Sequence, residues 1–93
     1  MDMTQTEVTN ADRAKWALDA ITKFVEETRA DTAVDAITDM IGDLLHLARG
    51  RDLDTDLISR NALAMMHSEI SEDIEGDMQS VQASFRTLLR EDA

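Results

Sequence analysis

Carboxylates and one histidine recur at helical spacing in the middle of the chain. Steps of three or four residues separate Asp35, Asp39, Gly42, Asp43, His46 and Arg49, so on a helix these residues form one stripe. Carboxylates four residues apart repel each other by about a few tenths of a kcal/mol, and a divalent cation or a basic partner would relieve this repulsion. Asp43 and His46 also have the spacing of an acid–histidine metal pair on one helix face. Three interpretations therefore stay open for this face: a solvated surface, a docking surface and a metal site.

Gly42 interrupts this stripe and lowers its helix propensity by about 1 kcal/mol. Such a glycine sometimes marks the close approach of another group. We assign no metal ligand and no cofactor. The four residues Asp35, Asp39, Asp43 and His46 form the second candidate face for binding a partner.

A run of acids near the C-terminal third is the first candidate for partner binding. It contains Glu69, Glu72, Asp73, Glu75 and Asp77, and no lysine or arginine lies between Arg60 and Arg86. Charge runs are usually solvated faces. A docking surface for a basic groove is the functional alternative.

Two further patterns are weaker. The segment 52–56 alternates Asp with other residues like the opening of a calcium loop, but Leu57 replaces the required glycine and Leu63 the terminal acid. Helix capping explains these acids without calcium. His67 could approach His46 across a helical hairpin, although the sequence does not require it.

The chain contains few other residues of the types that act in catalysis. The chain has two histidines and no cysteine, and it lacks serine-nucleophile motifs, phosphate-binding glycine loops and zinc signatures. We therefore expect that the protein is not an enzyme.

The elements that position these residues are predicted to be helices. The 93 residues suit one domain, proline is absent and there are only three glycines. We predict an all-α fold, a small bundle of three to four helices. Residues 9–90 would form a single helical domain between a flexible N-terminus (1–8) and a flexible C-terminus (91–93).

Capping signals set the predicted helix boundaries. Thr9 and Asp12 have the spacing of a capping box before the first helix. A break near residues 29–32 precedes a second helix over about 32–49, which Gly50 would end in a left-handed conformation. After a short connection, Asp54 would cap a third helix over about 55–70. These two helices would form an antiparallel central hairpin.

The remaining segment leaves two alternatives open. Apolar residues follow steps of 4, 4, 3, 4 and 3 through Gly76: Ile70, Ile74, Met78, Val81, Phe85 and Leu88. Either the third helix continues to about residue 90, or it breaks near Ser71 or Gly76 and a fourth helix follows. We expect a long C-terminal helix. A seam of this kind is buried by a partner helix, and we expect the bundle to form a homodimer.

The formal net charge of −11 makes direct nucleic-acid binding unfavourable. It suits a protein partner with a basic surface. The first ten residues do not resemble a signal peptide, and no apolar run approaches the roughly 20 residues of a membrane span. We therefore expect a cytoplasmic protein that does not bind membranes.

The middle of the chain resembles short, acidic, all-helical proteins of unassigned function from bacterial, phage and other mobile-element genomes. The similarity covers about residues 33–69 and depends on D-M-I-G-D-L-L-H (39–46), D-L-D (52–54) and A-L-A-M-M-H-S-E (62–69). Ser68 stands where these proteins usually have an aromatic residue. The resemblance implies a helical fold and a phage or prophage origin.

A more distant resemblance is to MazG-type nucleotide pyrophosphatases, whose magnesium is held by paired acids on neighbouring helices. Here Asp39 and Asp43 are four residues apart rather than three, and Glu69 with Glu72 or Asp73 would be the second pair. The first hypothesis is a small interaction module that binds and modulates a host or phage protein, for instance as an inhibitor on a nucleic-acid-binding surface. The alternatives are a metal-dependent nucleotide hydrolase and a purely structural homodimer.

Overall fold

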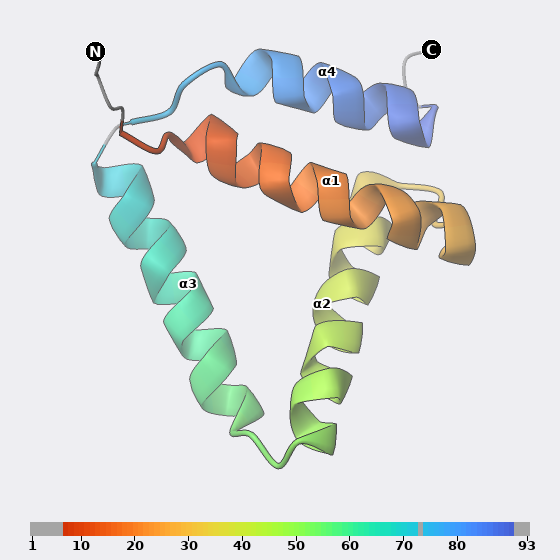
Figure 1. The fold of residues 1–93 in the computed structure, drawn as a ribbon, viewed down its shortest axis with the longest axis vertical. Coiled ribbons are helices and arrows are strands. Elements are labelled where there is room, and N and C mark those ends of the chain that lie inside the picture. The colour runs from red at the N-terminus through yellow and green to blue at the C-terminus, as the bar shows by residue number, and fades with distance from the viewer. Residues whose placement is uncertain (1–6, 73, 91–93) are drawn as a thin grey trace.

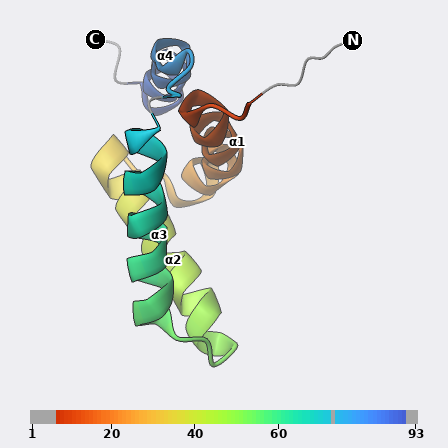
Figure 2. The same ribbon diagram turned by 90° about the vertical axis from the view of Figure 1, so that its left-hand side faces the viewer.

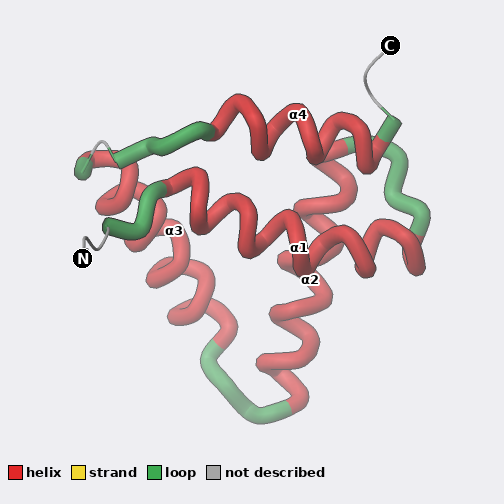
Figure 3. The backbone as a smooth tube through the Cα atoms, turned by 45° about the horizontal axis from the view of Figure 1, so that its top comes forward, coloured by secondary structure: helices red, strands yellow, loops and turns green. Residues whose placement is uncertain are grey.

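Helices make up most of the part of the chain that the structure describes. A computed structural model describes residues 7–72 and 74–90, and these form four helices and no strand (Figures 1 and 3). The helices are α1 (Asn10–Thr28), α2 (Ala33–Gly50), α3 (Thr55–Ser71) and α4 (Met78–Leu89). This confirms the predicted all-α class and the predicted number of helices.

Local capping explains where the first three helices begin. The Thr9 hydroxyl accepts a hydrogen bond from the Asp12 amide at 3.0 Å, and the Asp12 carboxylate accepts one from the Thr9 amide at 2.9 Å. This is the predicted capping box. Thr32 caps α2 by accepting from the Asp35 amide at 3.1 Å, and the Asp54 carboxylate caps α3. Each cap satisfies an amide that has no partner inside its own helix.

The connection between α2 and α3 differs from the prediction at Gly50. Gly50 is the last residue of α2, and the left-handed residue is Asp52, with φ of 58°. The prediction was wrong because the turn closes later: the amides of Arg51 and Leu53 both donate to the Ala48 carbonyl, at 3.0 Å each. Aspartate tolerates the left-handed region better than most residues.

The chain breaks between α3 and α4, so the alternative of one continuous helix is not adopted. The amides of Asn10 and Ala11 donate to the carbonyls of Ile74 and Glu75, at 2.7 Å each. These amides belong to the first turn of α1, which lacks intrahelical acceptors. Gly76 follows with a positive φ of 73°. As a result, the final helix has 12 residues and is the shortest of the four described helices, not the long C-terminal helix that we expected.

A small apolar core lies where α1, α4 and the start of α2 meet. Its buried members are Ile21, Val25, Ala36 and Leu89. Phe85 of α4 packs against this cluster from a partly buried position. α1 and α4 lie side by side in the views of Figures 1 and 2.

The α2–α3 hairpin, defined here as residues 33–71, projects away from this core. The two helices run in opposite directions and diverge from their connection like the arms of a V (Figure 1). A view from the side shows the hairpin extending beyond the layer of α1 and α4 (Figure 2). The radius of gyration is 15.2 Å, against about 12 Å expected for a compact domain of this length.

Candidate functional site

The acidic stripe of α2, defined as Asp35, Asp39, Asp43 and His46, lies on an exposed face of the hairpin. All four side chains are exposed, and no ion pair joins them to any described residue. The Arg49 guanidinium lies 3.4 Å from Nδ1 of His46. The three carboxylates therefore keep their charge available to a partner.

His46 lies beside the start of α3 rather than beside His67. It lines a shallow crevice of about 200 Å³ together with Gly42, Arg49 and Asp56. Thr55 and Ser59 also line it, whereas His67 lies about two turns farther along α3. The hypothetical approach of the two histidines is not seen in the described structure.

Two further expectations about α2 concern metal binding and Gly42. Among residues 7–72 and 74–90, no three His, Asp or Glu side chains gather closely enough to hold a metal ion. A Cβ atom built on Gly42 would meet nothing within 4 Å. No part of the described chain therefore approaches this glycine closely.

Most of the acid run at residues 69–77 is engaged within the chain. Glu69 forms an ion pair with Arg13 of α1 at 3.0 Å, and both side chains are largely shielded from solvent. The Glu75 carboxylate accepts a hydrogen bond from the side-chain amide of Asn10 (Nδ2) at 3.1 Å. Glu72 is exposed, and Asp73 lies outside the described residues. Glu69 thus joins the end of α3 to α1, and Glu75 joins the connection between α3 and α4 to the start of α1.

Asp77 is the N-cap of α4. Its carboxylate accepts from both the hydroxyl and the amide of Ser80, at 2.7 and 3.1 Å. These hydrogen bonds lower the pKa of Asp77 below its ordinary value of 3.8, because they favour the charged form. Asp77 therefore has a structural role that explains its charge.

A large exposed apolar surface was not anticipated from the sequence. Twelve large apolar side chains of the hairpin are between 38% and 74% exposed, and α3 contains no buried residue. They are Val34, Ile37, Ile41, Leu44, Leu47, Leu53, Leu57, Ile58, Leu63, Met65, Met66 and Ile70. Helical periodicity identifies such residues as a core face, but it does not reveal whether the same chain covers them.

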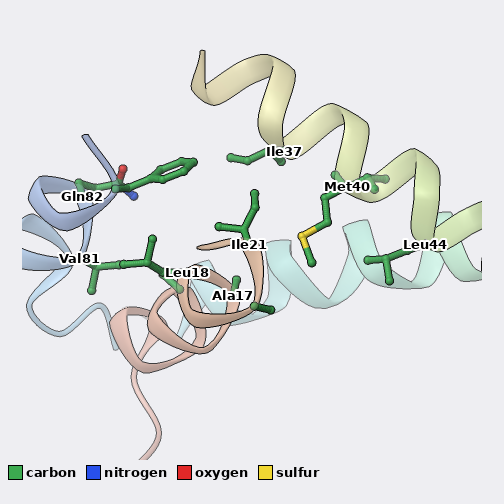
Figure 4. Close-up of a pocket in the computed structure, with 12 residues that line it drawn as sticks. Ala17, Leu18, Ile21, Ile37, Met40, Leu44, Val81 and Gln82 are labelled. Atoms are coloured by element: carbon green, nitrogen blue, oxygen red, sulfur yellow. The ribbon is translucent and has the colours of Figure 1, made fainter. Parts of the chain in front are cut away.

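One part of this surface borders an open groove between α1, α2 and α4. The groove has a volume of about 550 Å³ and an almost entirely apolar lining. Leu18 and Ile21 of α1 face Ile37, Met40 and Leu44 of α2 across it (Figure 4). No residue of α3 lines the groove.

Comparison with known proteins adds no relative. No protein-family model matches the chain, and no curated protein or solved structure is significantly similar to it. Within the described residues, none of the helices has the length and apolar character needed to span a membrane.

Proposed function

We propose that this protein is a small acidic interaction module, not an enzyme, that binds and modulates another protein. The proposal is supported by two exposed surfaces of the α2–α3 hairpin: the acidic stripe of α2, which would bind the other protein, and the apolar side chains, which a second copy would cover. Twelve large apolar side chains of the hairpin are 38–74% exposed. Exposed apolar patches larger than a few hundred Å² are typical of interaction sites.

The partner that suits the charge distribution has a basic surface. Asp35, Asp39 and Asp43 are exposed along α2 and form no ion pair with described residues. We therefore favour the acidic stripe of α2 as the docking surface, with Glu72 and the neighbouring acids as the second candidate. Docking of such a stripe on a nucleic-acid-binding groove would inhibit the partner by occupying its phosphate sites.

Three further parts of the proposal concern the oligomeric state, the location in the cell and the origin of the partner. The protein acts as a homodimer, because a chain with such a small core gains stability by burying its hairpin. It works in the cytoplasm. Its partner is a host or phage protein, an expectation that depends on the resemblance of residues 33–69 to proteins of mobile elements.

The decisive experiment captures partners from the cells that contain the protein. The tagged chain is compared with two variants that carry equal changes of charge. One variant reverses the stripe (Asp39→Lys and Asp43→Lys), and the other reverses the acid run (Glu72→Lys and Asp73→Lys). We expect the wild-type chain to retain one stoichiometric partner with a basic surface and the stripe variant to lose it.

Each remaining outcome has a defined meaning. Equal capture by the wild type and both variants would show that neither acidic face is the docking surface. Recovery of the protein alone would contradict a modulator and would favour the purely structural homodimer. Circular dichroism of both variants controls for loss of helical structure.

A further inference from the structure

The chain contains an apolar groove without an occupant and an apolar helix without a partner. The groove lies between α1, α2 and α4, and its walls include Leu18, Ile37, Leu44 and Phe85. Its lining contains no charged residue. The matching element is α3, in which no residue is buried.

The exposed side chains of α3 are of the kind that fill such a groove. Ile58, Met65, Met66 and Ile70 are 38%, 60%, 43% and 56% exposed. Methionine side chains are unbranched and adapt to irregular apolar surfaces. An amphipathic helix placed in an apolar groove is a common mode of recognition.

α3 cannot reach the groove of its own chain, because both of its ends are held. At its start, the connection from Arg51 to Asp54 ties it to the far end of α2. At its other end, the Arg13–Glu69 ion pair and the bond from the Asn10 side chain to the Glu69 carbonyl, at 3.2 Å, fix it to the start of α1. In this arrangement, the arms of the V stay apart (Figure 1).

We infer that a second copy of this chain supplies the occupant: α3 of each copy lies in the groove of the other, against its α1, α2 and α4. The inference depends on the proposed homodimer and names the surface through which it forms. A twofold axis makes the two contacts equivalent and leaves no groove open.

The available area is sufficient for a stable dimer. Nine of the twelve exposed apolar side chains of one hairpin lie on α3 or line the groove. Their exposed surface is of the same order as the roughly 800 Å² that each partner contributes to a standard interface. Obligate dimers have the more apolar interfaces, and this surface fits that class. A second copy is also the one partner that is always present at the concentration of the chain itself.

The charges of the chain do not oppose this contact directly. Asp35, Asp39 and Asp43 lie on the polar side of α2, opposite its apolar stripe. Glu69 of α3 already faces Arg13 of its own chain. The remaining repulsion acts between exposed acids, which salt screens over about 8–10 Å.

The first test is the mass of the purified full-length chain in solution, measured by analytical ultracentrifugation. We expect twice the chain mass of 10.4 kDa at micromolar concentration. Leu44→Lys in the groove and Met66→Lys on α3 should each weaken the dimer at least tenfold, while Ala83→Lys, a lysine at an exposed position of α4 outside the groove, should not.

The second test does not depend on the folding of the lysine variants. The chain has no cysteine, so Leu44→Cys and Met66→Cys each introduce a single reactive site. When the two variants are mixed and treated with a short bismaleimide, we expect a cross-link between different chains. Asp39→Cys mixed with Met66→Cys is the control that should not cross-link.

Three results would overturn the inference. The wild-type chain could sediment as a monomer, or it could stay dimeric in both lysine variants, which would place the interface elsewhere. A double variant with Leu44→Cys and Met66→Cys could instead cross-link within one chain, which would mean that α3 fills its own groove. These measurements use the purified chain alone, so they fail or succeed independently of the capture of a partner.

Discussion

α1 and α3 are helices of similar length, but they differ in how much of their surface is buried. α1 has 19 residues and buries Ala11, Ile21 and Val25, whereas α3 has 17 residues and buries none. Both contain apolar residues, but those of α3 are spread more widely around the helix than those of α1. α1 lies between α4 and the start of α2, while α3 contacts its neighbours mainly at its two ends.

The comparison shows which helices stabilise the folded single chain by burying apolar side chains. The core of α1, α2 and α4 excludes water from a few side chains, and each fully buried aliphatic side chain contributes about 1.5–3 kcal/mol. Apart from Ala36 and Ala48, the hairpin leaves most of its large apolar side chains 38–74% exposed, so they contribute less to stability until another surface covers them. The hairpin is therefore available for binding.

The largest expected effect is the loss of stability when a buried side chain of α1 is shortened. Ile21 is 6% exposed, and Ile21→Ala should lower the free energy of unfolding by about 2–5 kcal/mol because it leaves a cavity. Met65 is 60% exposed, so Met65→Ala should change this free energy far less in dilute solution. Chemical denaturation monitored by circular dichroism measures both.

Protein concentration sharpens this contrast. If α3 is covered by a second copy, the cost of Met65→Ala should grow as the concentration rises, because dimerisation stabilises the folded state by mass action. A cost for Met65→Ala that equals that of Ile21→Ala at every concentration would contradict the exposed position of α3.

The helix boundaries could be predicted because their signals are local. Thr9 and Asp12 satisfy each other's amides within four residues. Thr32 and Asp54 each accept a hydrogen bond from the amide three residues later. The break after Ser71 could not be decided in this way, since the apolar steps continue through it. Its cause is the pairing of residues 74–75 with the start of α1, a contact between distant parts of the chain.

The candidate site was only partly predictable for a related reason. The sequence identified the acids, but it could not show that Glu69 faces Arg13 or that Glu75 binds Asn10. It also identified the apolar faces without showing which of them stay uncovered. A pattern indicates that a face is apolar, and only the arrangement of the helices shows whether it is buried.

The second prediction tests the contact at Gly76, where the connection between α3 and α4 meets the start of α1. A Cβ atom there would lie 2.8 Å from the Thr9 Cβ and 3.1 Å from the Ala11 Cβ, in a residue with φ of 73°. Thr9 cannot move aside without losing its cap on α1. Gly76→Ala should therefore lower the free energy of unfolding by about 1–3 kcal/mol, measured by denaturation.

Gly42 is the matched control for this prediction. Its Cβ position is open and it lies inside α2, so Gly42→Ala should raise the free energy of unfolding by about 0.5–1 kcal/mol. If both substitutions stabilised the protein, the close approach at Gly76 would be refuted. Loss of partner capture by Gly42→Ala, with higher stability, would show that the partner approaches this position.

The smallest expected effect concerns Asp77, the N-cap of α4. Its pKa is lowered in the folded state by the bonds from Ser80, so its carboxylate stabilises the fold at neutral pH. This contribution is complete above the ordinary pKa of 3.8 and is lost as the pH falls through the lower folded value.

Asp77→Asn isolates this contribution, because asparagine still caps a helix but does not titrate. The wild type should have the higher unfolding midpoint at pH 7, and the difference should be smaller at pH 2, because the stabilisation by the charged carboxylate is lost as the pH falls below 3.8 and through the lowered folded pKa. Thermal denaturation at the two pH values measures the difference, and the other carboxylates affect both proteins equally. A constant difference across this range would mean that the Asp77 charge does not stabilise α4 and that its hydrogen bonds to Ser80 act through geometry alone.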